Sequence, residues 1–188
     1  MSLLAGELRV IDRLGLLDPK LMVDVGSCFG EHGILLRPKY PELRVLEFDP
    51  QNGTCALGAE DGELELSVFP YVPERSSGAK KYLEQLQADL VVHRKVPMFR
   101  LDSFFTEEID FLKVDVEGME MDVLLGLGDL RPSLVQFEFG FANTMAGLSL
   151  ADFYRFFRPW GYEVLQLDWE GNYGNWLAAP PALLKKFF

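Results

Sequence analysis

Four acidic side chains stand within eight residues of the stretch FLKVDVEGMEMD (111–122), and they are Asp115, Glu117, Glu120 and Asp122. Carboxylates at this spacing can line a solvated helix face, bind a cation or accept a proton from a reacting hydroxyl. Asp115 and Glu117 follow an apolar run, whereas the other two fall in the first turn of a predicted helix, where acids complement the helix dipole. We therefore expect Asp115 and Glu117 to take part in chemistry, and Glu120 and Asp122 to be solvated or structural.

A glycine-rich loop, VDVGSCFGEHG (23–33), follows a short apolar run and precedes a predicted helix. Open α/β sheets bind ligands at such turns, beyond the carboxyl ends of the strands. The loop departs from the dinucleotide pattern G-x-G-x-x-G, because Cys28 and Glu31 occupy its second and third glycine positions counted from Gly26. Glu31 would also oppose a pyrophosphate at the helix N-terminus. The loop therefore favours a ligand without phosphates.

An acid ends the second predicted strand, RVLEFD (44–49), and this Asp49 follows Asp24 by 25 residues. In nucleotide-binding α/β folds, an acid at this place accepts hydrogen bonds from ribose hydroxyls. Loop and acid together favour a nucleoside without phosphates, and S-adenosylmethionine is the commonest cofactor of that kind. Its cationic sulfonium suits an acidic pocket. The alternative is that the glycines only form the strand-to-helix turn and that Asp49 only begins the next turn.

The composition bounds the class of protein. The chain has 188 residues, of which 48% are hydrophobic and 13% aromatic, and this suits one globular domain with a sizeable core. A formal net charge of −11 disfavours nucleic acid or an anionic membrane as partner and favours a small molecule. Two cysteines and two histidines exclude a disulfide scaffold and a His-rich metal site.

Strands alternate with helices along the chain, which predicts an α/β fold with a mostly parallel central sheet. The predicted strands are 21–26, 44–49, 63–69, 96–101, 109–116 and 133–139, and the predicted helices are 30–40, 118–127 and 149–157. Ser149 is the expected N-cap of the last helix. Two closing strands, 162–168 and 175–180, are joined by so few residues that they must be antiparallel. Residues 70–95 are expected to form a lid or acceptor loop.

The N-terminal stretch MSLLAGELRVIDRL is expected to be an amphipathic helix, because Leu4, Leu8, Ile11 and Leu14 recur at helical spacing. Charged residues interrupt it too often for a signal peptide, and no apolar run reaches the roughly 18 residues of a membrane span. We therefore expect a cytoplasmic protein. Its single domain would comprise an N-terminal helix in 1–20, a cofactor-binding core in 21–140, and a C-terminal helix and strands in 141–188.

Six segments occur in the order found in the FkbM-type methyltransferases: VDVGSCFG, VLEFDP, ALGAEDGELEL, RLDSF, IDFLKVDVEGMEMDVLLG and SLVQFEFG. The sequence resembles this family from residue 21 to 140, and the LKVDVEGMEMDVLLG block is the most specific part. The resemblance implies a Rossmann-like class I methyltransferase fold, with helices on both faces of the sheet and an antiparallel C-terminal strand. It also implies S-adenosylmethionine as cofactor and O-methylation of a hydroxyl on a sugar or small metabolite.

The resemblance also assigns roles to residues. The methionine part of the cofactor would be held by Asp24 and by the loop residues Gly26, Ser27, Cys28, Phe29 and Gly30. Asp49 would bind the ribose hydroxyls, and Ala56 and Leu57 would lie near the adenine. Asp115 would lie beside the transferred methyl group, with Glu117 turning into the helix that follows.

The sequence departs from the family between Pro50 and Ala56, where only QNGTC stands in place of a helix and a strand. A right-handed parallel crossover needs a dozen or more residues. Either the adenine side of the pocket is rebuilt or a stretch of the protein is missing from this sequence. We favour the missing stretch, because the flanking motifs are intact.

Methyl transfer to an alcohol requires an aligned acceptor, exclusion of water and a group that takes the hydroxyl proton. Asp115 is the first candidate for that group, although an acid there can equally bind the ammonium of the cofactor. Glu117, Glu138 and His32 follow. The three acids could form an all-oxygen magnesium site, but the resemblance does not require a metal and we predict none. Two alternative functions are an NAD-type nucleotide-binding domain and a non-catalytic interaction module with the same fold.

Overall fold

The computed structural model describes residues 5–69, 76–79 and 91–188. Its large sheet has six strands in the order β2-β1-β6-β7-β9-β8. Their bounds are β1 Leu21–Val25, β2 Arg44–Phe48, β6 Phe111–Val114, β7 Leu134–Gly140, β8 Glu163–Gln166 and β9 Tyr173–Ala179. β2, β1, β6 and β7 are parallel neighbours, whereas β9 runs antiparallel to both β7 and β8. This confirms the predicted α/β class, the mostly parallel sheet and the antiparallel closing pair.

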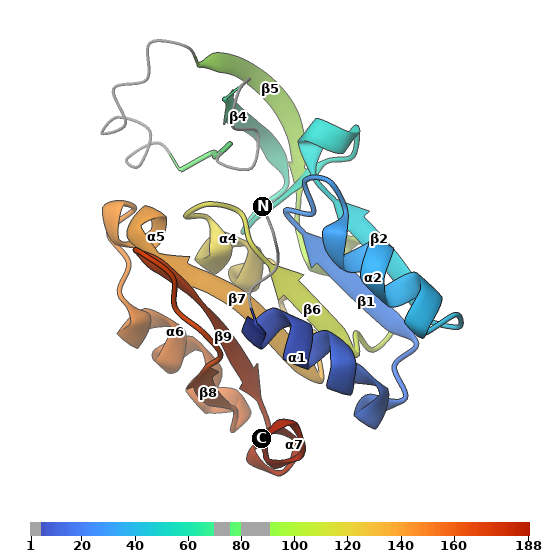
Figure 1. Ribbon diagram of the computed structural model, residues 1–188. Coiled ribbons are helices and arrows are strands. Elements are labelled where there is room, and N and C mark those ends of the chain that lie inside the picture. The colour runs from blue at the N-terminus through green and yellow to red at the C-terminus, as the bar shows by residue number, and fades with distance from the viewer. Residues whose placement is uncertain (1–4, 70–75, 80–90) are drawn as a thin grey trace.

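Helices cover both faces of the large sheet, as predicted (Figure 1). One face carries α1 (Ala5–Arg13), α2 (Glu31–Lys39) and α7 (Pro181–Phe187), and the other carries α4 (Glu120–Leu125) and α6 (Leu150–Phe157). A further short helix, α5 (Phe141–Met145), continues directly from β7. Single 3-10 turns are η1 Leu14–Leu17, η2 Pro50–Asn52, η4 Leu101–Ser103 and η5 Arg158–Trp160. Ser149 is the N-cap of α6, as expected, and its N–H donates to Asp152 Oδ2 at 2.8 Å.

A second sheet of three strands lies beyond the carboxyl ends of the parallel strands, at the top of Figure 1. Its order is β3-β5-β4, with β3 Ala56–Leu57, β4 Gly62–Val68 and β5 Val92–Phe99. The strand predicted over 63–69 is therefore confirmed. The strand predicted over 96–101 begins four residues earlier, because β5 pairs with β4 along its whole length. Most of the lid predicted over 70–95 lies outside the described residues.

The N-terminal helix is confirmed as α1, but its buried face differs from the prediction. Ile11 and Leu14 are buried as expected, whereas Leu8 is 43% exposed, and Glu7 and Val10 are buried without having been predicted to be. Glu7 Oε1 accepts a hydrogen bond from Gln136 Nε2 of β7 at 3.1 Å. A polar partner on the sheet therefore sets the rotation of α1, which apolar spacing alone does not reveal.

The short connection after β2 leads to the second sheet. From Asp49 the chain passes through η2 and enters β3, which pairs with β5 rather than β2. β2 is consequently an edge strand of the large sheet. The residues QNGTC fit this connection, and the missing stretch stays a prediction. In the described part of the chain, no helix is long and apolar enough to cross a membrane.

Candidate active site

An open pocket of about 570 Å³ lies between the two sheets, at the carboxyl ends of β1, β2 and β6. Large-sheet strands and the turns that follow them supply one side, from Val25, Gly26, Cys28, Phe48, Asp49, Pro50, Gln51, Asp115, Val116, Glu117 and Met119. The second sheet and its neighbourhood supply the other side, from Ala56, Leu57, Leu64, Leu66, Ser76, Ser77 and Gly78. This is where open α/β sheets bind ligands.

Gly26 shapes the floor of the pocket, because no other residue fits its position. Its φ is +80°, and an added Cβ would come within 1.7 Å of the Asp115 carbonyl oxygen. The Gly26 N–H also donates to Phe48 O at 2.8 Å. The ends of β1, β2 and β6 can therefore approach one another closely only with glycine here.

Asp49 ties two pocket loops together. Its side chain is buried, Oδ2 accepts the N–H of Cys28 at 2.8 Å, and Oδ1 accepts the N–H of Gln51 at 2.8 Å. Cys28 has a left-handed φ of +46°, so this bond holds the glycine loop in an uncommon conformation. Each carboxylate oxygen has a further lone pair, so ligand hydroxyls can still donate to Asp49.

The structure brings five of the nine predicted cofactor residues to the pocket wall: Gly26, Cys28, Asp49, Ala56 and Leu57. Three others belong to the same loop but do not line the pocket. Ser27 is buried and its Oγ accepts from Asn52 Nδ2 at 3.0 Å, Phe29 is 64% exposed, and Gly30 is the left-handed N-cap of α2. The ninth, Asp24, lies within β1, behind the pocket floor.

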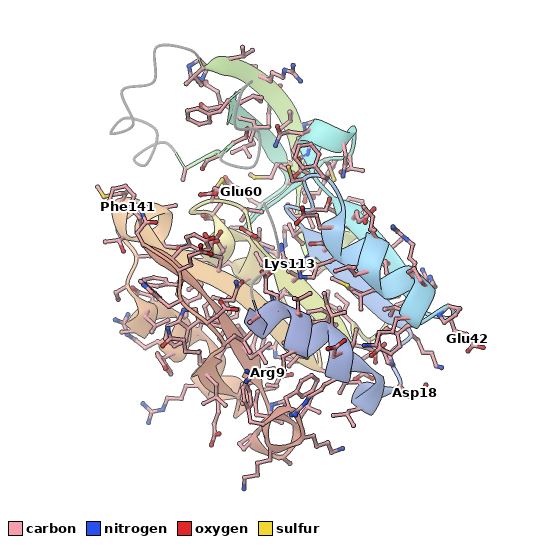
Figure 2. All side chains as sticks on the ribbon, in the orientation of Figure 1. Arg9, Asp18, Glu42, Glu60, Lys113 and Phe141 are labelled. Carbon is pink, nitrogen blue, oxygen red and sulfur yellow. The ribbon has the colours of Figure 1, made fainter. Side chains whose placement is uncertain are left out.

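Asp24 belongs to a buried charged row that also contains Lys113 and Asp115. Lys113 Nζ lies 3.1 Å from Asp115 Oδ2 and 3.8 Å from Asp24 Oδ1. In Figure 2, Lys113 lies near the centre of the molecule, whereas Asp18 and Glu42 lie at its edge. Burial disfavours the ammonium form, but Asp115, Asp24 and Glu7 outweigh burial and raise the pKa of Lys113. The lysine is therefore charged.

The Asp24 carboxylate has unused hydrogen-bonding capacity. It is 1% exposed, and neither oxygen has a hydrogen-bond partner among the residues that the structure describes. Burial raises the pKa of Asp24 to about 6, although Lys113 opposes the shift. Buried polar atoms without partners are rare in native proteins and call for a water or a ligand.

Glu117 and Glu138, the second and third candidates for the base, lie close enough to Asp115 for the three acids to interact electrostatically. Glu117 lines the pocket in a left-handed conformation, with φ +53°. Glu138 of β7 is 7% exposed and does not line the pocket. Burial, followed by Asp115 and Glu117, raises the pKa of Glu138 well above its ordinary value. The neutral acid is therefore the favoured form of Glu138.

His32 occupies a different place from the pocket. It is 3% exposed beneath α1, with Nε2 3.5 Å from Glu7 Oε1, and it does not line the pocket. Burial, together with the charge of Lys113, lowers the pKa of His32 well below its ordinary value. This position gives no support to a catalytic role.

Glu120 was expected to be solvated or structural, and the structure supports the second alternative, because the side chain is fully buried. Its carboxylate accepts backbone N–H groups of the turn that carries Glu117. Asp122 is half-buried on the same helix, and burial raises its pKa. An acid in the first turn complements the helix dipole whether it is buried or exposed, so the sequence pattern does not tell a buried acid from an exposed one.

Sequence reasoning missed the side of the pocket formed by β4 and residues 76–79. Leu64 and Leu66 face the pocket, and their alternation with Glu63 and Glu65 in ELELSVF is the signal that could have identified them. Ser77 is 1% exposed, and its Oγ donates to the Glu117 carbonyl at 2.6 Å. No sequence spacing indicates this contact, which joins residues 40 positions apart.

A mostly parallel sheet with its pocket at these strand ends and an antiparallel β9 defines a Rossmann-like class I methyltransferase fold. Two solved structures share it. The methyltransferase FkbM from Methylobacillus flagellatus KT superimposes with a TM-score of 0.54 at 16% identity, over 86% of this chain and 43% of that one. The O-methyltransferase TomG from Streptomyces achromogenes, solved in complex with SAM, superimposes with a TM-score of 0.51 at 15% identity, over 95% of this chain and 81% of that one.

The family model of the methyltransferase FkbM domain matches residues 24–164 of the sequence, and the chain belongs to this family. The resemblance inferred from the six segments is thus confirmed. Methyltransferase 1 of Beauveria bassiana (strain ARSEF 2860) is 32% identical over 155 residues, covering 63% of this chain and 62% of its own. Methyltransferase sdnD of Sordaria araneosa is 26% identical over 163 residues, covering 61% of this chain and 63% of its own. The chain thus spans less than two thirds of the length of these relatives.

Proposed function

We propose that the protein is an S-adenosylmethionine-dependent methyltransferase that methylates a hydroxyl of a sugar or another small metabolite. The observation that carries this proposal is the pocket between the sheets. It combines the Gly26 floor, the carboxylate of Asp49 at the end of β2, and the acids Asp115 and Glu117 after β6. Family membership and the two relatives named as methyltransferases support it.

The residues of the pocket fit this cofactor. The carboxylate of Asp115 lies at the pocket wall and suits an ammonium group, and Asp49 retains lone pairs for ribose hydroxyls. Ala56, Leu57, Leu64 and Leu66 form an apolar wall that suits a flat adenine ring. When bound, the cofactor supplies a methyl group on a cationic sulfur.

An acceptor hydroxyl must lose its proton, and the acids after β6 are the groups placed to take it. Asp115 accepts a hydrogen bond from the Lys113 ammonium, and Glu138 does not line the pocket. Glu117 lines the pocket at the turn that follows β6, and we assign it the role of base. Asp115 would then contribute to binding of the ammonium group.

The acceptor is proposed to be a small molecule, because the net charge of −11 repels polyanions. TomG, which shares the fold, is described as an O-methyltransferase, and this supports a hydroxyl as the methylated group. A cytoplasmic location is part of the proposal. It is supported by Cys28 and Cys55, neither of which is in a disulfide.

Thermal unfolding with S-adenosylhomocysteine, compared with NAD, tests the proposal. A ligand that binds the native state raises the melting temperature, so S-adenosylhomocysteine should shift it and NAD should not. A shift with NAD alone would identify a dinucleotide-binding domain instead. No shift with either ligand would favour a non-catalytic module and overturn the proposal.

A further inference from the structure

Glu120, the first residue of α4, is a buried acid for which the proposed chemistry has no use. Its side chain is 0% exposed, although an acid at the start of a helix is ordinarily solvated. Burial raises its pKa to about 7, against the opposing effect of hydrogen bonds from Val116 and from its own backbone. A carboxylate with no exposed surface does not reach an acceptor in the pocket, so its purpose must lie in what it holds.

The Glu120 carboxylate lies inside the turn that connects β6 to α4. Oε1 accepts the N–H of Val116 at 2.8 Å, and Oε2 accepts the N–H of Gly118 at 3.1 Å. The residue between these two donors is Glu117, whose left-handed φ of +53° is unfavourable for a residue with a side chain. On the other side, the Glu117 carbonyl accepts from Ser77 Oγ. The strained residue is therefore held on both flanks.

Asn143 of α5 extends this arrangement to a second strand. Its Nδ2 donates to Glu120 Oε2, and its Oδ1 accepts the N–H of Gly140 at 2.8 Å. Asn143 is 1% exposed, so both bonds are shielded from water. Gly140 ends β7 and lies two residues beyond Glu138. One buried carboxylate–amide pair thus joins the end of β6 to the end of β7.

We propose that Glu120 is a positioning residue, which acts with Asn143 to fix the turn 115–118 against the end of β7 and so shapes the cofactor pocket. The inference rests on the proposed function, because Asp115, Val116 and Glu117 line that pocket. Loss of the pair releases the turn from its strained conformation and moves these three residues. Glu120 itself exchanges no proton with the substrate.

A swap of the two side-chain types tests this role. Glu120→Gln alone sets one amide NH2 against that of Asn143, and Asn143→Asp alone sets two carboxylates together. The double variant Glu120→Gln/Asn143→Asp again gives the turn and the pair their acceptors. An amide oxygen in place of Oε1 can accept the N–H groups of Val116 and Gly118, which lie 2.8 and 3.3 Å from that position, while the amide nitrogen donates to the new carboxylate. Asp122→Asn is the matched control, since Asp122 lies on the same helix and takes no part in the pair.

The measurement is the dissociation constant of S-adenosylhomocysteine by calorimetry, at a temperature where circular dichroism shows the compared variants to be folded. Each single variant should bind at least about tenfold more weakly, as expected for the loss of a hydrogen bond to a charged group. The double variant and Asp122→Asn should bind like the parent. A role limited to stability would lower the melting temperature and leave this affinity unchanged.

The outcomes separate the two proposals. A parent protein that does not bind S-adenosylhomocysteine overturns the proposed function and, with it, this inference. If the parent binds and a folded Glu120→Gln variant binds equally well, the inference alone is wrong. If the single variants do not fold, the double variant decides: binding like the parent supports the role, and failure to fold or tenfold weaker binding contradicts it.

Discussion

The two faces of the large sheet carry different side chains near the carboxyl ends of its strands, where the pocket lies. Toward α4 and α6, buried apolar side chains continue to the strand ends, with Val25, Val114 and Phe137. Toward α1 and α2, the apolar side chains are Met22, Phe111 and Leu134. Two residues further along the same strands, the buried side chains are polar: Asp24 and Lys113, which belong to the charged row, and Gln136. Replacing a complete set of buried, paired charges by apolar residues of similar volume often costs no stability, so stability does not require the charged row. Its place beside the pocket indicates a functional reason.

The apolar face should respond to truncation with a large loss of stability and with no change in ligand binding. Phe137 is fully buried and stacks on Phe153, with ring centroids 4.7 Å apart. Phe137→Ala should lower the free energy of unfolding by about 3–5 kcal/mol in urea denaturation. Its folded fraction should bind S-adenosylhomocysteine as the parent does. Weaker binding by that fraction would show that Phe137 also shapes the pocket.

The charged face should respond with a loss of stability that depends on pH. Lys113→Met leaves Asp24 and Asp115 without their buried cation, which should cost about 3–5 kcal/mol near pH 7. The pKa of Asp24 is already raised to about 6, so protonation at pH 5 should relieve much of this cost. Urea denaturation at both values measures the difference. An equal loss at pH 5 and pH 7 would contradict the assignment of a charged row.

A smaller effect of opposite sign is expected at Glu138. Its pKa in the folded state is raised by burial and by Asp115, so the folded protein retains a proton that the unfolded chain releases above about pH 4.5. Its stabilising contribution is therefore lost as pH rises. Glu138→Gln should exceed the parent in stability at pH 8 by on the order of 1–3 kcal/mol, and the difference should shrink toward pH 5. If the difference in stability between Glu138→Gln and the parent did not change with pH, the pKa of Glu138 would not be raised and the prediction would be wrong.

Element types were predictable from the sequence because they depend on local periodicity and on turn residues. The run before Gly26 is β1, the alternating ELELSVF is β4, and the segment after Ser149 is α6. The pocket residues at strand ends followed from the same logic. Parallel strands present their carboxyl ends at one edge, so Gly26, Asp49 and Asp115 had to meet there.

Long-range polar contacts were not predictable. Glu120 was expected to be solvated or structural, and the sequence did not reveal that its buried carboxylate accepts from Asn143, which is 23 residues away. Leu8 was placed in the buried face of α1, yet Glu7 occupies that face through Gln136, which is 129 residues away. Apolar periodicity identifies a helix and an approximate face, but it carries no signal for a polar side chain whose partner lies on another strand.

Binding of S-adenosylhomocysteine beside Asp49 is the claim on which the proposed function depends most. Isothermal titration calorimetry of the parent, Asp49→Ala and Glu117→Ala tests it most directly. The parent should bind one equivalent, and Asp49→Ala should bind at least about tenfold more weakly, because ribose hydroxyls lose a charged acceptor. Glu117→Ala should bind like the parent, since we assign it to the acceptor proton. No binding by the parent, or equally tight binding by a folded Asp49→Ala variant, would contradict this site.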